Sequence, residues 1–85
     1  MHLSTAQLKQ ISASLFQFFR SKDRPPANEM KIPISSIRAE RGSVNTFFAT
    51  IIYIVEYCGK KEHTVRIKFK VDTTGKFLNE TWSYV

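Results

Sequence analysis

The sequence contains one cysteine and three glycines among its 85 residues. Because Cys58 has no second cysteine to pair with, an intrachain disulfide and a zinc site made of several thiolates are both excluded. The three glycines do not form the Gly-rich loop that holds phosphate groups in many nucleotide-binding proteins. A lone thiol favours a reduced compartment over a disulfide-stapled secreted domain.

The chain also lacks a long apolar run. Its longest apolar-rich stretch, FFATIIYIV at residues 47–55, is far shorter than the roughly 20 residues that a membrane-spanning helix needs. The first residues, MHLSTAQLKQ, lack the apolar segment of a secretory signal. We therefore expect a cytoplasmic protein with no membrane partner.

Acidic residues are few. Seven Asp and Glu stand against 13 Lys and Arg, which gives a net charge of +6 and a pI near 9.8. Such a balance favours encounters with nucleic acid, anionic membranes or acidic proteins. The cations are spread along the chain and their longest run is Lys60-Lys61, so there is no basic tail. No RNP, KH or helix-turn-helix pattern is present either.

The candidate catalytic groups do not assemble into a recognisable active site. Glu56, Glu62 and Glu80 show no spacing typical of the carboxylate pair of a hydrolase. Cys58 and His63 are expected to be neighbours across a hairpin end, as a nucleophile and its base would be, but no third group is in place to orient the imidazole. We therefore expect no enzyme activity, no metal site and no cofactor.

The length predicts a single domain over residues 1–85, and the domain begins with a helix. Ser4 and Gln7 have the spacing of a capping box. Apolar residues then recur at helical spacing, namely Leu8, Ile11, Leu15, Phe18 and Phe19. Pro25 and Pro26 end the helix, because proline has no N–H to donate.

The remainder of the sequence predicts four strands joined by short turns. The strands are expected at residues 31–39, 44–58, 64–71 and 76–85, and Pro33 makes the first one irregular. The turns are expected at residues 40–43, 59–62 and 72–75, each of which contains one glycine. The expected fold class is therefore α+β, with one N-terminal α-helix packed on a four-stranded antiparallel β-meander.

This layout resembles, in its arrangement, a small cystatin-like or NTF2-like roll. The glutamine-valine-glycine loop of the cystatins does not occur in this sequence, where the corresponding turn is Arg41-Gly42-Ser43-Val44-Asn45. The resemblance therefore implies a fold and no functional residues.

The turns also predict which side chains share a face of the sheet. With Lys60-Lys61 at the hairpin tip, Ile54 lies opposite Ile67 and Ile52 lies opposite Phe69. The face below the helix then contains Phe48, Ile52, Ile54, Val65, Ile67, Phe69 and Val71. The outer face contains Ile51, Tyr53, Val55 and Tyr57 beside the basic residues of the strand TVRIKFKV, residues 64–71.

A bulged hairpin is expected at Asp72-Thr73-Thr74-Gly75. The cross-strand pairs in that register are Lys70 with Leu78, Lys68 with Glu80, and Arg66 with Trp82. Trp82 and Tyr84 then join the outer face, whereas a slip of one residue would send both to the core side. The first register is preferred because it pairs Glu80 with a lysine instead of burying it.

A single helix, about 10 Å wide, covers only one face of a sheet whose strands lie about 4.8 Å apart. An apolar outer face of this size is more than a soluble monomer usually exposes, so we expect another molecule to cover it. The expected binding residues are Tyr53, Tyr57, Arg66, Lys68, Lys70, Trp82 and Tyr84, and the expected interface residues are Ile51, Val55 and Leu78.

The sequence thus predicts a small, basic, non-enzymatic binding protein. It would associate with itself as a homodimer or occlude a protein partner with an acidic surface, in the manner of an inhibitor or immunity protein. The alternative is a single-stranded nucleic-acid-binding module, in which bases stack on the outer rings while the basic row neutralises phosphates.

Overall fold

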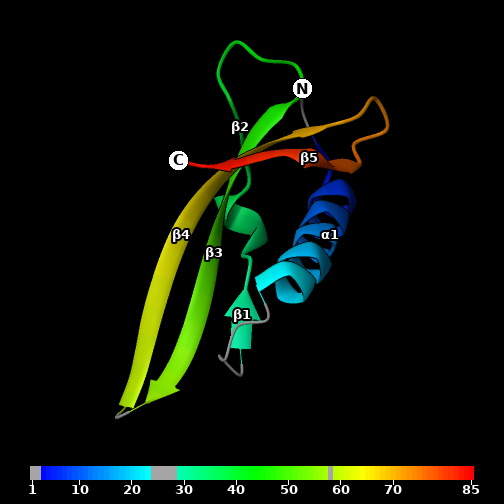
Figure 1. Cartoon of the computed structure of the whole chain (residues 1–85). Helices are drawn as coiled ribbons and strands as arrows, with labels where there is room; N and C mark the ends of the chain where they lie inside the picture. The colour runs from blue at the N-terminus through cyan, green and yellow to red at the C-terminus, as the bar shows by residue number, and fades with distance from the viewer. Residues whose placement is uncertain (1–2, 24–28, 58) are drawn as a thin grey trace.

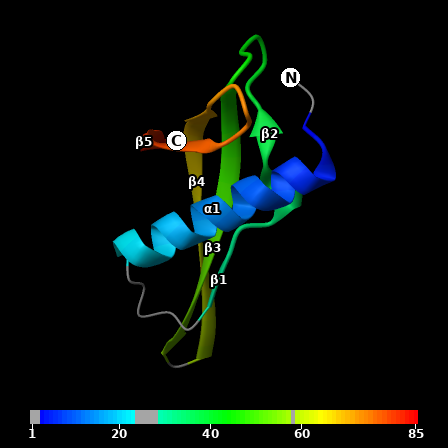
Figure 2. The ribbon, with the colours of Figure 1, turned by 90° about the vertical axis from the view of Figure 1, so that its right-hand side faces the viewer.

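The computed structural model describes residues 3–23, 29–57 and 59–85, and it describes the side chains of all of these except 23, 29, 55–57 and 59–61. The elements in chain order are α1 (Thr5–Asp23), β1 (Glu29–Lys31), the 3-10 helix η1 (Ile34–Ser36), β2 (Arg38–Ala39), β3 (Thr46–Tyr57), β4 (Gly59–Val71) and β5 (Phe77–Tyr84). The antiparallel sheet has the order β1-β3-β4-β5, and β2 pairs with another part of β3. Helix α1 crosses one face of this sheet (Figures 1 and 2).

The predicted α+β class, one helix packed on an antiparallel sheet, is confirmed. The described sheet has five strands and not four, because the first predicted strand is divided into two.

Helix α1 begins where the sequence predicts. The Ser4 N–H donates to Gln7 Oε1 at 2.8 Å, and the Gln7 N–H donates to Ser4 Oγ at 3.2 Å, which is the expected capping box. The centre of the apolar stripe faces the sheet, where Ile11, Leu15 and Phe19 are at most 1 % exposed. Each successive turn of the helix therefore contributes one large side chain to the core.

The core lies between α1 and the sheet face that α1 covers. The sheet contributes Phe47, Ala49 and Ile51 of β3 and Ile67, Phe69 and Val71 of β4, all at most 2 % exposed. Successive side chains of a strand point to opposite sides, so the residues between these six point to the other face of the sheet. We call that second face the outer face; α1 is the only α-helix of the described chain, and it lies on the opposite side (Figure 2).

Residues 31–39 do not form the single strand that the sequence predicts. Pro33, which has no N–H to contribute to a ladder, precedes η1 and has a φ of −62°. β1 and β2 therefore pair with separate parts of β3. Between them, the Thr50 N–H of β3 donates to the Ser36 Oγ of η1 at 3.1 Å. The interruption thus keeps the sheet edge hydrogen-bonded through a side chain.

The predicted register of β3 and β4 is wrong. Ile67 pairs with Ala49 and not with Ile54, which lies five positions further along β3. The predicted turn at 59–62 is instead the beginning of β4. Because five is an odd number, the displacement exchanges the two faces of β3. Ile51 and Tyr53 consequently lie on the helix side, whereas Phe48, Ile52 and Ile54, which were expected in the core, lie on the outer face.

Burial of the Thr50 hydroxyl would disfavour the predicted register. Strand β3 carries large apolar residues on both faces, so its alternation by itself does not select the core face. In the predicted register Thr50 would be placed below α1, at a cost for its polar group. In the observed register Ala49 occupies that side and is fully buried without burying any polar side-chain atom.

The turn between β4 and β5 forms as predicted. The Gly75 N–H donates to the Asp72 carbonyl oxygen at 3.0 Å, and Gly75 has a φ of 85°, in the left-handed region that glycine adopts without strain. Lys70 pairs with Leu78, which is the register expected from this turn.

Strand β5 leaves the predicted register beyond that first part of the hairpin. A bulge shifts the ladder by three residues, so that Lys68 pairs with Ser83 and not with Glu80. The side chain of Thr81 fills the gap, because its Oγ1 accepts the Lys70 N–H at 2.9 Å and donates to the Leu78 carbonyl oxygen at 2.7 Å. Because three is an odd number, the side chains of β5 beyond the bulge point to the face opposite to the predicted one.

Acid should weaken the β4–β5 turn. Asp72 Oδ1 accepts hydrogen bonds from Thr74 Oγ1 at 2.6 Å, from the Lys76 N–H at 2.9 Å and from the Thr74 N–H at 2.8 Å, and these bonds lower the pKa of Asp72 below its usual value of 3.8. A lowered pKa gives stability that is present above the unfolded-state pKa and is lost as the pH falls below about 4. We expect Asp72→Asn to show a smaller loss of urea stability between about pH 5 and about pH 2.5 than the native chain does.

Glu80→Gln is the matched control for this pH series, since Glu80 is an exposed carboxyl of the same hairpin. Equal pH slopes for Asp72→Asn and Glu80→Gln would contradict the role of Asp72.

Candidate functional site

Three of the rings that were predicted on the outer face, Tyr53, Trp82 and Tyr84, lie on the helix side. Trp82 packs edge-to-face on Phe19 and on Tyr84, with ring centroids 5.0 Å and 5.1 Å apart. Lys22 Nζ lies 4.9 Å from the centroid of the Trp82 ring. Tyr53 is half-buried against the same core. The predicted aromatic platform therefore does not form, because the odd register shifts in β3 and β5 both turn rings towards α1.

The other predicted site residues are dispersed as well. Ile51 is buried in the core, whereas Leu78 is half-buried on the outer face. The side chains of Val55 and Tyr57 lie outside the described part of the structure. Lys68 pairs with Ser83 and not with Glu80, and the carbonyl oxygen of Arg66 accepts the Val85 N–H at 3.0 Å, so Arg66 does not pair with Trp82.

The predicted pair of Cys58 and His63 includes Cys58, which lies outside the described residues. His63 itself pairs with Tyr53, so the hairpin register from which the pair was predicted is not the observed one.

The basic row of β4 lies on the outer face, as predicted. Arg66, Lys68 and Lys70 alternate with the buried residues Ile67 and Phe69. Two further cations, which the sequence analysis did not identify, join them from the short strands: Arg38 of β2 pairs with Phe48, and Lys31 of β1 pairs with Ile52. The outer face is therefore more basic than the alternation in β4 alone indicates.

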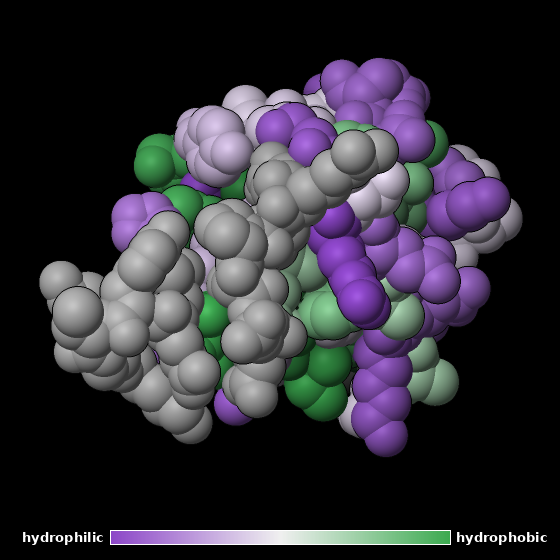
Figure 3. Space-filling model, turned by 60° about the horizontal axis from the view of Figure 1, so that its bottom comes forward, coloured by the Kyte–Doolittle hydropathy of each residue, from purple (hydrophilic) through white to green (hydrophobic). Residues whose placement is uncertain are grey.

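The outer face combines these cations with apolar side chains. Its apolar members are Phe48, Ile52, Ile54 and Leu78, all of them half-buried. Glu40, beside Lys68, and Glu62, opposite Ile54, are carboxylates of this face. In the view from the lower end of the molecule, hydrophilic residues predominate on the right, and hydrophobic residues lie among hydrophilic ones elsewhere on the described surface (Figure 3).

Phe48 lies at the centre of the cations. It is flanked in register by Arg38 on one neighbouring strand and by Lys68 on the other. The guanidinium carbon of Arg66 lies 5.0 Å from the centroid of the Phe48 ring, and Lys68 Nζ lies 6.0 Å from it. The alkyl stems of such side chains cover apolar surface, which explains why a ring on an uncovered face is half-buried. Three positive charges are thus gathered around one hydrophobic ring.

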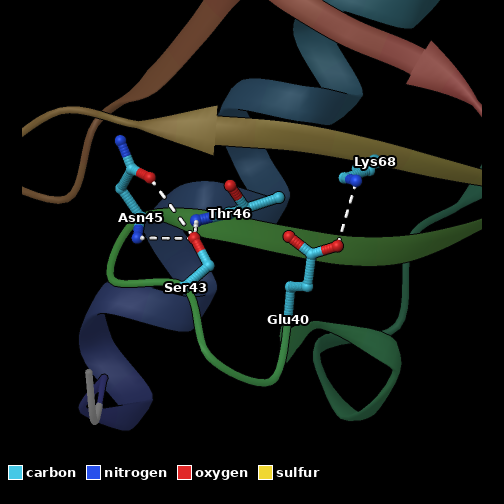
Figure 4. A network of polar contacts seen from close by, with 5 residues as sticks. All are labelled: Glu40, Ser43, Asn45, Thr46 and Lys68. Carbon is cyan, nitrogen blue, oxygen red and sulfur yellow. Dashed lines mark hydrogen bonds and ion pairs between the residues drawn. The ribbon is translucent and has the colours of Figure 1, made fainter.

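A carboxylate of the chain itself already contacts this cluster. Glu40 Oε1 lies 3.0 Å from Lys68 Nζ, and the two side chains are 34 % and 42 % exposed (Figure 4). The Glu40 backbone is held in place, because its N–H donates to the Thr46 carbonyl oxygen at 2.8 Å. The loop is closed by Ser43, whose Oγ accepts the Thr46 N–H at 3.1 Å (Figure 4). Any external carboxylate that binds to Lys68 must compete with Glu40.

The described residues contain no group of three His, Cys, Asp or Glu side chains that could hold a metal ion. Every buried side-chain nitrogen or oxygen among them has a hydrogen-bond partner.

Comparison with known proteins identifies no relative of this chain. No family model, no curated protein and no solved structure matches it. In the part of the chain that the structure describes, no helix is both long and apolar enough to cross a membrane.

Proposed function

We propose that this protein is a small non-enzymatic binding protein whose outer face docks on an acidic surface of another protein. The observation that supports this best is the composition of that face: Arg38, Arg66 and Lys68 lie around the half-buried Phe48, and Lys31 and Lys70 lie further along the same face. A hydrophobic centre with charged surroundings is the usual anatomy of a protein interface. The half-buried apolar side chains of the face would anchor the complex, while the cations guide the encounter and exclude basic partners.

The action that fits such a chain is occlusion of its partner, as by an inhibitor or immunity protein. A binding face on a rigid sheet needs no moving part and no cofactor. We place this action in the cytoplasm, in keeping with the single cysteine.

Single-stranded nucleic acid is the second candidate, and the ring positions make it the weaker one. Bases need exposed ring faces on which to stack. Trp82 packs against α1, and the Phe48 ring of the outer face already has the Arg66 guanidinium 5.0 Å from its centroid. Without stacking, the cations would hold a nucleic acid by its phosphates alone.

Charge also disfavours a homodimer in which two outer faces meet. Such a dimer would bring the cations around Phe48 in one copy against the same cations in the other, and like charges across an interface are unfavourable. The partner is therefore a different molecule, and sedimentation at low salt should give a monomer.

The test is a titration with two polyanions of equal charge. Labelled poly-glutamate and labelled oligothymidylate are each titrated with the protein at about 50 mM and about 200 mM salt. We expect poly-glutamate to bind at the lower salt concentration and to bind more weakly at the higher one. Absence of binding at low salt would contradict the proposal. An affinity for oligothymidylate more than about tenfold higher would favour the nucleic-acid function instead.

Glu40→Gln is expected to strengthen the binding of poly-glutamate about threefold, because it frees Lys68 from an exposed ion pair of about 0.2–1 kcal/mol. The same titration measures the effect. Glu80→Gln removes an equal charge from an exposed position of β5 and serves as the control. If both variants bind equally well, Glu40 does not compete for the site.

A further inference from the structure

A groove of about 420 Å³ lies between one side of α1 and the beginning of β5. Its floor is aromatic, because Phe18 and Phe77 meet edge-to-face with ring centroids 5.6 Å apart. Phe77 is buried and Phe18 half-buried, so the rings are held in place by the core. The groove lies on the helix side of the sheet, away from the outer face. Its two phenylalanine rings form an apolar surface on which one side chain of a ligand can pack.

The rim of the groove is polar. Helix α1 contributes the Gln17 amide and the hydroxyls of Ser14 and Ser21, which can donate hydrogen bonds. Among the described residues that line the groove, the charged ones are Lys22 and Lys76, on its two sides. A ligand that complements this rim is anionic.

The free edge of β5 is a second, independent feature of the same place. β5 is the last strand in the sheet order, and β4 is its partner among the described strands. The Asp72 N–H donates to the Lys76 carbonyl oxygen, so the backbone groups of Lys76 face the β4 side. Because the direction alternates along a strand, the N–H and C=O groups of the next residue, Phe77, face away from β4. Such groups are a template for an added strand.

We propose that an extended acidic segment of a protein binds in this groove as a strand added to the edge of β5. Its backbone would pair with Phe77, in the way that peptides add to the edge strands of recognition domains. One apolar side chain would rest on the two phenylalanine rings, and a neighbouring carboxylate would approach Lys76. The regular ladder of β5 ends at Leu78, where the bulge begins, so the segment is short. This site does not depend on the function proposed for the outer face.

The test is an NMR titration of the isotope-labelled protein with the acetylated and amidated peptide Glu-Glu-Leu-Glu-Glu. We expect saturable shifts of the backbone amides of Gln17, Phe77 and Asn79. Shifts confined to the amides of Arg66 and Lys68 would overturn the groove site and leave the outer-face function standing. Shifts confined to the amides of the groove would support the groove site and contradict the outer-face function. The titration therefore distinguishes a failure of one proposal from a failure of the other.

Two exposed lysines provide a matched pair of variants for this titration. Lys76→Ala removes a charge from the groove, whereas Lys9→Ala removes an equal charge from α1 outside it. We expect Lys76→Ala to weaken the peptide about threefold relative to Lys9→Ala, since both variants change the net charge equally. Equal affinities would overturn the role of the groove.

N-methylated peptides test the added strand itself. Only alternate residues of an added strand donate hydrogen bonds to the neighbouring edge. Methylation of one alternate set of peptide amides should therefore weaken binding by more than about tenfold, and methylation of the other set should not. Equal binding of the two methylated peptides would show that charge alone holds the ligand, and would overturn the strand addition.

Discussion

Phe19→Ala is expected to lower the free energy of unfolding by about 3–5 kcal/mol, the usual cost of removing a buried aromatic ring. Phe19 is fully buried, and its ring packs edge-to-face on Phe18 at 5.1 Å and on Trp82 at 5.0 Å. A domain of this size has a total stability on the order of 5–15 kcal/mol, so the loss would leave a substantial unfolded fraction. Urea unfolding followed by the fluorescence of the single tryptophan measures it.

Val44→Ala is the control for this measurement, because Val44 is 76 % exposed and should change the stability by less than about 0.5 kcal/mol. A similar result for the two variants would contradict the packing of α1 on the tryptophan side of the sheet. It would also contradict the observed register of β5, since only the bulged register brings Trp82 below the helix.

The double variant Arg66→Ala/Lys68→Ala is expected to weaken poly-glutamate binding about tenfold at low salt. The two cations lie 5.0 Å and 6.0 Å from the centroid of the Phe48 ring, so one ligand surface would contact both. Removing two exposed charges costs about 1–2 kcal/mol of interaction, and tenfold corresponds to about 1.4 kcal/mol. The loss should shrink as salt screens the remaining charges.

The matched control is Lys9→Ala/Arg20→Ala, which removes the same net charge from exposed positions of α1. This control should lose about threefold or less, through the overall field of the protein only. If the two double variants weaken binding equally, the affinity arises from the net charge of +6 and not from the outer face.

Local patterns were sufficient for the elements of the fold. The capping box of Ser4 and Gln7 depends on residues within one helical turn, and the structure contains it. Pro33 interrupts pairing through its missing N–H, which is also a local property, although the sequence did not show that two separate strands and η1 would result.

The candidate site was predictable only where one strand carried an unambiguous pattern. In residues 64–71 all apolar residues have one parity, so Arg66, Lys68 and Lys70 had to share the opposite face. Strand β3 has apolar residues at both parities, and its pairing with β4 decided that Phe48 and not Tyr53 belongs to the outer face. Lys31 and Arg38 gave no local signal, because they reach this face through partners in β3 that are distant in the sequence.

The local sequence alone therefore determined one helix, a set of strands, their turns and a basic row on β4. The tertiary structure alone decided which rings are covered and which cations meet around Phe48. The physical reason is that side-chain direction in a strand alternates with every residue. A single bulge or a shorter connection can therefore exchange the side chains that point to the core and those that point to the outer face. The free energy that selects between the two faces comes from packing against α1, which contacts several strands at once.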